Sequence, residues 1–283
     1  MNRGAMMIQI NISDIFDKTS INDFLKSFYI SKSKIYQLNN HIYINELPAR
    51  MNDQLNTNDR MIIDFSPLGL NTVKPYQGDI EILYEDSDVL VLNKQKDILV
   101  HTDGNTIDTL TNRVAYHYHN AVYPILPVHR LDFETSGILV FAKHPLAHAY
   151  LAYQFENRLV EKTYIAMVLG VVMDNQGVID KPIARDRHSD KQIVFKNGKE
   201  AKTIYEVIKR FQDKTLVKIN IIGGRKHQIR VHFESIGHPI IGDKRYGHFH
   251  QSVDSLKLHF KNIKFMHPTL RTYSELDTKK DHF

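Results

Sequence analysis

The residues best suited to chemistry stand together in one short turn before an apolar run. Asp132 and Glu134 supply two carboxyl groups, and Thr135 and Ser136 add two hydroxyls. Residues 138–143 (ILVFAK) are rich in branched and aromatic side chains, which predicts a buried strand. A carboxylate placed here lies at the edge of a rigid element beside a loop, where catalytic groups are often found. By residue type the two acids are equivalent, and Asp132 also fits a turn in which the side chain bonds its own backbone.

The same turn carries a signature. HRLD at 129–132, followed by TSG at 135–137, resembles the HRLDxxTSG signature of the RluA family of RNA pseudouridine synthases. The resemblance implies isomerisation of uridine in RNA: the bond from C1′ to N1 breaks, the uracil turns, and it rejoins through C5. This reaction needs no redox cofactor and no metal, and the chain contains no HExxH, P-loop or Rossmann glycine pattern.

Other segments resemble further family motifs, in the same order along the chain. KTYIA at 162–166 resembles the second motif, and GRKHQIRVH at 224–232 with GHPIIGD at 237–243 resembles the third. The segment that ends with ILVH at 98–101 resembles the first motif, with Gln95 where that motif has proline. We therefore expect the family likeness to extend over most of the chain.

The resemblance implies a role for each matching residue. Asp132 is the expected catalytic carboxylate, which acts at the sugar as nucleophile or base and must be ionised. Burial favours the protonated form of a carboxyl group, whereas a guanidinium that donates two parallel hydrogen bonds opposes this. We assign that partner role to Arg230, with Arg225 as the alternative if Arg230 contacts phosphate. Tyr164 is expected to stack on the uracil.

RNA contacts are expected around this centre. Because C1′ is inaccessible in a stacked helix, the target nucleotide must be flipped out, and Arg130 is placed to fill the vacated space. His129 is expected to contact a backbone phosphate. The full substrate-binding set expected from the resemblance is Arg130, His129, Arg225, His227, Lys162, Lys32 and Lys34.

Composition limits the remaining possibilities. The 283 residues suffice for a domain of about 200 residues and a smaller one. The chain has no cysteine, and its 16 histidines show no recognised ligand spacing, so we expect no metal site. No apolar run approaches the roughly 20 residues of a membrane span, and no signal peptide is evident. A monomeric cytoplasmic protein is expected.

Positive charge is concentrated in one part of the chain. The formal net charge is +5, yet residues 181–230 hold 14 Lys and Arg against 5 Asp and Glu, whereas residues 9–70 hold 6 against 7. Such a basic segment suits a polyanionic partner, because neutralised phosphates release counterions. A solvated basic surface is the alternative explanation.

The N-terminal part resembles an S4-type RNA-binding module. A capping pattern at 19–23 and helical spacing predict a helix up to about residue 28, and a second helix is predicted at 33–38. Alternating segments at 41–45 and 60–65 predict strands. Asn40 and Asn58 stand where the S4 family usually has glycine.

We therefore predict three parts: an S4-like module at 1–70 with a poorly ordered leader at 1–8, a linker at 71–78, and a catalytic domain at 79–283. The expected fold class is α+β, with a mixed, mainly antiparallel sheet flanked by helices and loops and preceded by the small α/β module. A strand at 256–266 is expected to close the sheet, and the tail at 272–283 offers little to pack. The first turn of a helix at 228–233 carries cations, which the helix dipole disfavours, so they need another reason to be there, such as a carboxylate or phosphate partner.

Two functions remain open from the sequence. The first is a pseudouridine synthase that acts on ribosomal RNA, in particular that of the large subunit, as S4-bearing relatives mostly do. The alternative is a non-catalytic RNA-binding or ribosome-assembly protein that retains the fold.

Overall fold

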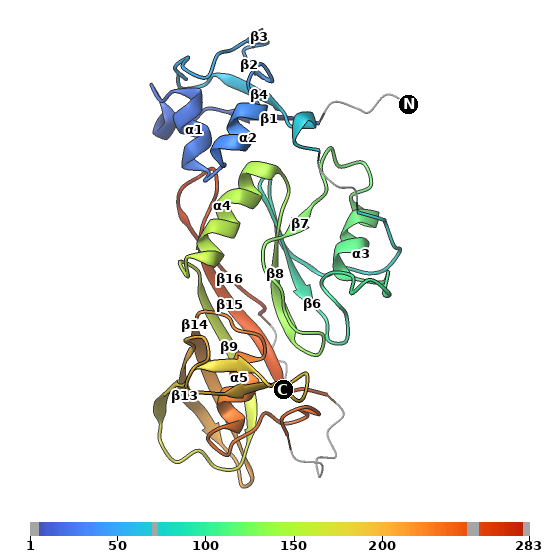
Figure 1. Cartoon of the computed structure of the whole chain (residues 1–283), viewed down its shortest axis with the longest axis vertical. Coiled ribbons are helices and arrows are strands. Elements are labelled where there is room, and N and C mark those ends of the chain that lie inside the picture. The colour runs from blue at the N-terminus through green and yellow to red at the C-terminus, as the bar shows by residue number, and fades with distance from the viewer. Residues whose placement is uncertain (1–5, 70–72, 248–254, 280–283) are drawn as a thin grey trace.

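The structure is a computed structural model that describes residues 6–69, 73–247 and 255–279. Figure 1 shows a small N-terminal module (residues 6–69) at one end of a long main domain (residues 82–279). Between them, residues 73–81 contain neither helix nor strand, at the place of the predicted linker. None of the helices in the described part of the chain has the length and hydropathy that crossing a membrane requires.

The N-terminal module packs two short helices against a small antiparallel sheet with the order β1-β4-β2-β3. Its elements are β1 (Met7–Asn11), a 3-10 turn η1 (Asp14–Phe16), α1 (Ile21–Ser27), α2 (Lys32–Gln37), β2 (Ile42–Ile44), β3 (Leu47–Pro48), β4 (Arg60–Asp64) and η2 (Ser66–Leu68). The helices and strands predicted in this region are therefore confirmed, within a few residues at their ends.

Local sequence explains where the module's helices begin. The Ser20 side chain accepts a hydrogen bond from the Asp23 backbone N–H at 3.1 Å, as the capping pattern predicts. Asn40 and Asn58 have φ values of 67° and 71°. Asparagine tolerates this left-handed conformation better than most residues, which explains how it replaces glycine at both positions.

The predicted leader at 1–8 is wrong where it can be checked. Residues 1–5 lie outside the described residues, but Met7 and Ile8 belong to β1, which pairs along its whole length with β4. The residues that pair with this strand lie between 49 and 57 positions further along the chain, so the short N-terminal segment alone does not indicate that it is ordered.

The main domain is built on a ten-stranded sheet. The main path has the order β10-β13-β14-β9-β15-β8-β6-β5, while β7 pairs with β8 and β16 with β15. The strands are β5 (Ile82–Glu85), β6 (Val89–Lys94), β7 (Leu126–Pro127), β8 (Ser136–Ala142), β9 (Glu161–Leu169), β10 (Gln176–Asp180), β13 (Lys202–Arg210), β14 (Lys214–Ile222), β15 (Leu258–Met266) and β16 (Tyr273–Asp277). Only the β8–β15 pair is parallel among the described strand pairs, so the predicted mixed, mainly antiparallel sheet is confirmed.

Helices and a small ribbon complete the main domain. In the described part of this domain the helices are α3 (Leu110–His117), α4 (Pro145–Glu156) and α5 (Gln228–Glu234), near their predicted positions, and β11 (Ile183–Arg185) pairs with β12 (Gln192–Val194). Strands β6 and β8 are buried along their whole length, as the continuous apolar run at 138–143 predicts. Figure 1 shows α3 and α4 beside the half that contains β6 and β8, and α5 beside the other half.

Two predictions about the C-terminal region are wrong. Strand β15 does not close the sheet; it lies in its middle, parallel to β8 on one side and antiparallel to β9 on the other. The segment after Pro268 does not lack packing, because β16 pairs with β15 over five residues. Alternation identifies a strand but not its neighbours, and the order of this sheet depends on contacts between distant segments. Residues 280–283 of the predicted tail lie outside the described residues.

Gly137 allows the two halves of the sheet to meet. It has φ +117°, and a Cβ atom at this position would collide with the backbone carbonyl of Phe260. The close approach aligns Ser136 with His259, and the Ser136 hydroxyl lies 2.9 Å from His259 Nδ1. The glycine of the TSG motif therefore fixes the start of β8, directly after the turn that contains Asp132.

The N-terminal module shares a hydrophobic core with the main domain. Leu146 and Tyr150 of α4 are buried in the same cluster as the module's apolar residues. The Arg271 guanidinium lies 4.5 Å from the Phe28 ring centroid and 4.0 Å from that of Tyr150. It also donates a hydrogen bond to the backbone carbonyl of Ser27. The module is thus docked on α4 and on the turn after β15.

Candidate active site

The turn before β8 is held from beneath by a buried lysine. Lys94, at the end of β6, donates hydrogen bonds to the backbone carbonyls of Gln95, Phe133 and Thr135 at 2.8–3.0 Å. Burial lowers the pKa of Lys94 to about 7, against the opposing effect of the Asp132 charge. Two of these carbonyls flank Glu134, so the backbone beside Asp132 has a fixed course.

A glycine turn brings a second segment to the same place. After β14, Gly223 and Gly224 have φ values of 102° and 155°, and His227 has φ 56° immediately before α5 begins. The Arg225 backbone N–H donates to the Gln228 side chain, whose amide nitrogen donates to the Lys202 carbonyl. These bonds direct the first turn of α5 toward the Asp132 turn.

Arg230 connects three carboxylates, but its principal partner is not the expected one. Its Nε and Nη2 donate two hydrogen bonds of 2.7 Å to Asp243, and Nη2 also lies 2.7 Å from Glu134 Oε2. The distance from Nη1 to Asp132 Oδ2 is 3.8 Å. The prediction that Arg230 holds Asp132 through two parallel hydrogen bonds is therefore wrong, because Asp243 occupies the two-bond position. The predicted need for an anionic partner at this helix start is confirmed.

Arg230 stays protonated at this position. Burial alone would lower the pKa of its guanidinium, but the Asp243 bonds together with the Glu134 and Asp132 charges raise it overall. Asp243 is buried too, yet the bond to Arg230 keeps the pKa of its carboxyl below the usual value. A permanent positive charge thus lies close to Asp132.

His227 approaches Asp132 from the other side. Its Nε2 lies 3.8 Å from Asp132 Oδ1, and its Nδ1 lies 2.8 Å from the Tyr246 hydroxyl. Burial lowers the pKa of His227 to about 4, so the ring is neutral at pH 7. The Tyr246 hydroxyl accepts a hydrogen bond from the Gln192 N–H, which leaves its own proton for Nδ1. This arrangement favours the tautomer with its proton on Nε2, facing Asp132.

Tyr164 lies across the pocket from these groups. Its ring is buried and stacked on Phe260, with ring centroids 4.5 Å apart. Burial, with a contribution from the Asp132 charge, raises the pKa of its hydroxyl above the usual value. The hydroxyl therefore stays protonated at neutral pH, which agrees with the predicted stacking role and not with a role as a base.

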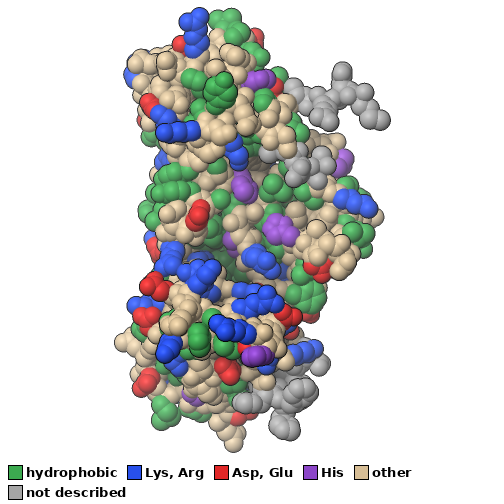
Figure 2. All heavy atoms as spheres, in the orientation of Figure 1, with side chains coloured by type: hydrophobic (Ala, Val, Ile, Leu, Met, Phe, Trp, Pro, Cys, Tyr) green, Lys and Arg blue, Asp and Glu red, His purple; other side chains and the backbone are tan. Residues whose placement is uncertain are grey.

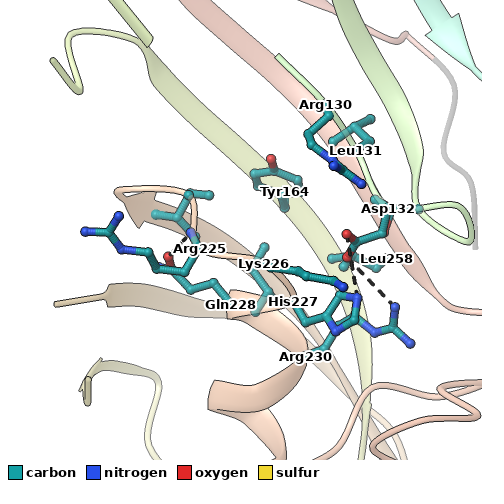
Figure 3. A pocket seen from close by; sticks show the side chains of 14 residues that line it. Arg130, Leu131, Asp132, Tyr164, Arg225, Lys226, His227, Gln228, Arg230 and Leu258 are labelled. Carbon is teal, nitrogen blue, oxygen red and sulfur yellow. Dashed lines mark hydrogen bonds and ion pairs between the residues drawn. The ribbon is translucent and has the colours of Figure 1, made fainter. Parts of the chain in front are cut away.

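Together these segments enclose a pocket of about 200 Å³. It is lined by residues 130–132 and Thr135 from the turn, Tyr164 from β9, Ile221 from β14, residues 224–230 and Leu258 from β15. Figure 3 shows Asp132 directed toward His227 and Arg230, with Tyr164 and Arg130 on the neighbouring wall. The pocket brings together Asp132, Arg230 and Tyr164, the three residues expected from the sequence to form the catalytic centre.

Comparison with known proteins agrees with this arrangement. Residues 88–235 match a family model described as RNA pseudouridylate synthase. The chain is 36% identical over 278 residues to the uncharacterized RNA pseudouridine synthase YhcT of Bacillus subtilis, which covers 95% of this chain and 92% of that protein. The chain belongs to the RNA pseudouridylate synthase family. The predicted resemblance and the predicted enzyme class, an isomerase, are confirmed.

Two further relatives extend the comparison. The ribosomal large subunit pseudouridine synthase D of Pasteurella multocida is 39% identical over 180 residues, which cover 62% of this chain and 55% of that protein. The structure of human RNA pseudouridylate synthase domain containing 1 superposes with a TM-score of 0.63 at 26% identity, covering 74% of this chain and 85% of that one. The pseudouridine synthase fold of the main domain is thereby confirmed.

Within this pseudouridylate synthase, two of the predicted contacts need correction. His129 Nε2 accepts a hydrogen bond from the Val140 N–H at 3.1 Å, and its ring stacks on Phe155. Burial, with the Lys162 charge, lowers the pKa of His129 to about 3, so a neutral ring packed on β8 does not suit the predicted phosphate contact. Arg225 donates from Nε to the Glu200 carbonyl and is directed away from Asp132, so it is not the alternative partner (Figure 3).

The other predicted binding residues lie in three places. Arg130 is exposed and lines the pocket. Lys162 is buried, and its Nζ lies 2.6 Å from the Gly223 carbonyl, next to Gly224 of the pocket lining. Lys32 and Lys34 are exposed on α2 of the N-terminal module, outside the pocket. Figure 2 shows Lys and Arg side chains gathered on the face of the main domain that is turned to the viewer, at the level of β9, β14 and β15.

Three residues that contribute to the site were not predicted from the sequence. Asp243 binds Arg230, Tyr246 binds His227, and Lys226 lines the pocket. Asp243 was part of the GHPIIGD motif, but the motif gives no indication that its carboxylate turns back onto α5. Tyr246 lies just beyond that motif, and its ring also lies under the Arg230 guanidinium at 5.4 Å.

Proposed function

We propose that this pseudouridylate synthase modifies uridine in large-subunit ribosomal RNA, with Asp132 as the carboxylate that acts on the sugar. The carrying observation is that Asp132, Tyr164 and Arg230 come from three distant segments and meet in one pocket. The similarity to a relative named as a ribosomal large subunit enzyme supports the choice of RNA.

The geometry around Asp132 suits a carboxylate that must react while ionised. Arg230 and His227 each approach it at 3.8 Å, which is longer than a direct hydrogen bond. The Arg230 charge balances that of the carboxylate, whereas the neutral His227 ring contributes only a polar N–H. The carboxylate thus has lone pairs left for the substrate. It either attacks C1′ or removes a proton from the sugar, and both routes require the ionised form.

Arg130 and Tyr164 would manage the displaced base. The target nucleotide must leave the helix before its C1′ is accessible. Arg130, exposed at the pocket, has a planar group that can occupy the vacated space. Tyr164 already packs one side of its ring on Phe260, which leaves the other for the uracil while it is detached and turned. The product keeps every atom of the substrate except that the C5 proton is exchanged for one on N1.

The basic surface would hold the surrounding RNA. Lys and Arg side chains spread over the face around β9, β14 and β15 (Figure 2). Phosphate contacts supply affinity without sequence preference. Lys32 and Lys34 of the N-terminal module would extend this surface, if the module acts as the S4 type does.

The test compares pseudouridine maps of total RNA from cells with and without the gene, followed by purified enzyme on unmodified large-subunit RNA. We expect one or more uridines to lose modification in the deletion strain and to regain it in vitro. The Asp132→Asn enzyme should show no turnover, while its RNA affinity stays within about twofold of wild type because the replacement keeps size and polarity. Unchanged maps would favour the non-catalytic RNA-binding alternative, and collapse of binding in Asp132→Asn would show that Asp132 is structural.

A further inference from the structure

A second pocket adjoins the catalytic pocket. It has a volume of about 310 Å³ and is lined by Arg158, Val160, Glu161 and Lys162 on one side and by residues 220–223 on the other. Ile221 lines both pockets, and Gly223 precedes Gly224 of the catalytic pocket. The two spaces therefore lie side by side at the end of β14.

Two cations face this second pocket. Lys162 is buried on β9, and a Cβ atom on Gly224 would lie 3.7 Å from its Nζ, which places the ammonium at the wall between the pockets. Arg158 is exposed just after α4, where its φ is 61°. Glu161, the acid at the rim, pairs with Lys264 at 3.2 Å. Among the described residues, no carboxylate forms an ion pair with Lys162 or Arg158.

This pair of cations is costly without an anion. Burial lowers the pKa of Lys162 to about 8, and the Arg158 charge acts in the same direction. Lys162 donates one hydrogen bond, to the Gly223 carbonyl, although an ammonium carries three donors. Bringing a phosphate to the two cations would relieve the repulsion between them and satisfy the remaining donors.

We propose that this second pocket binds the backbone phosphate of a nucleotide next to the target uridine, with Arg158 as its direct ligand and Lys162 as the buried countercharge. The inference rests on the proposed function, because the occupant of the catalytic pocket determines which anion can reach the neighbouring one. An RNA strand whose uridine lies over Tyr164 has its adjacent phosphates within one nucleotide of that ring. The phosphate subsite therefore selects an extended, unstacked strand at the target.

The first experiment measures RNA binding against salt concentration. The probe is an unmodified large-subunit RNA fragment that contains the mapped uridine. Arg158→Gln is exposed and should fold normally; we expect about tenfold weaker binding at low salt. We also expect the slope of log K against log salt to decrease by about 0.7–0.9, the value for one lost phosphate contact.

The control is Lys214→Gln, which removes a charge at the opposite end of β14, about 26 Å from Ile222. This variant should keep the wild-type slope. Lys162→Gln should resemble Arg158→Gln, and its thermal unfolding is measured alongside to separate a folding defect from a binding defect. Equal slopes in wild type, Arg158→Gln and Lys214→Gln would overturn the subsite.

The second experiment identifies the phosphate. Single neutral methylphosphonate linkages are placed in turn at the phosphates on either side of the target uridine. At one position the wild-type enzyme should lose about tenfold in affinity, and Arg158→Gln should lose nothing further there. Independent losses at every position contradict the proposal. If the wild-type enzyme converts the uridine normally but the salt slopes are equal or every linkage causes an independent loss, the subsite alone is refuted. If the wild-type enzyme does not convert the uridine, the proposed function is refuted.

Discussion

Asp132 is held by charge and not by short hydrogen bonds. At 3.8 Å, a unit charge on Arg230 interacts with the carboxylate by about 4 kcal/mol at an effective dielectric constant of 20. The two short bonds of the guanidinium go to Asp243 instead. Arg230 is thus fixed by one aspartate in order to influence another, and Asp132 remains able to adjust to the sugar during the reaction.

Asp243→Asn should therefore harm both stability and catalysis. The substitution removes the charge that compensates Arg230 in a buried place, so we expect the free energy of unfolding to fall by about 3 kcal/mol. Pseudouridine formation should also slow, because the guanidinium loses its two charge-assisted bonds to Asp243 and no longer has a fixed position beside Asp132. Urea denaturation and single-turnover assays measure the two effects.

The matched control is Glu46→Gln, which breaks the exposed ion pair with Arg60. A surface pair contributes little, so we expect a change within about 1 kcal/mol and full activity. Equal destabilisation by the two substitutions would mean that the Asp243 pair is not the anchor of Arg230.

The pH dependence of stability should reveal that His129 is neutral in the folded protein. Its pKa is lowered from 6.5 to about 3, mainly by burial, so the unfolded chain binds a proton between these values and the folded chain does not. This contribution to stability is complete above pH 6.5 and is lost as the pH falls toward 3. His129→Gln keeps an acceptor for the Val140 N–H without titrating. We expect unfolding of this variant at pH 4–6 to take up about one proton fewer than wild type; an unchanged pH dependence from urea denaturation would argue against a neutral His129.

Among the elements, α5 shows what the sequence could and could not reveal. Cationic residues in its first turn predicted an anionic partner, and the structure supplies Glu134 and Asp243. The identity of that partner was beyond the sequence, because Asp243 reaches Arg230 only through the course of the loop after α5. The same limit applies to β15. The alternation of its apolar and polar residues predicts a strand, but its place between β8 and β9 depends on residues more than ninety positions away.

A substitution of Gly137 tests the contact between β8 and β15. Gly137→Ala adds a Cβ that collides with the Phe260 backbone, so β8 and β15 must separate. Gly104→Ala is the matched control, since Gly104 has a similar φ of +100° but nothing within 4 Å of the added atom. Backbone strain alone should cost the control about 1–3 kcal/mol of unfolding free energy. Gly137→Ala should cost at least about 2 kcal/mol more and abolish activity; equal losses in both variants would show that only φ matters.

In the whole molecule, the two parts predicted from the sequence are less separate than expected, because they share a hydrophobic core. The sequence predicted two units joined by a linker at 71–78, and residues 73–81 do lack helix and strand. The packing of Tyr150 and Leu146 into the module's core was not predicted from the sequence. Helix α4 is apolar around most of its circumference and not along a single stripe, which is typical of a helix covered on more than one face. Removal of residues 1–70 would expose this core, so the role of the module is better tested by substitutions that leave it in place.

Arg271 offers that test, because its guanidinium lies over Phe16, Phe28 and Tyr150 and joins the module to α4. A partly desolvated cation–π contact contributes about 2 kcal/mol, so Arg271→Ala should loosen the module without unfolding the main domain. We expect faster hydrogen exchange in α1, whereas Lys209→Ala, which removes the cation over Phe211, should leave α1 unchanged.

A loosened N-terminal module should also hold its lysines less firmly in position relative to the catalytic pocket. In wild type, Lys32→Gln combined with Lys34→Gln is expected to weaken RNA binding by about tenfold. In the Arg271→Ala background the same pair should weaken it by only about threefold, because a mobile module must be ordered again on binding. A gel-shift or fluorescence titration of the four variants gives the coupling. Identical losses in the two backgrounds would mean that the module binds RNA independently of its docking, and no loss in either would place the RNA elsewhere on the protein.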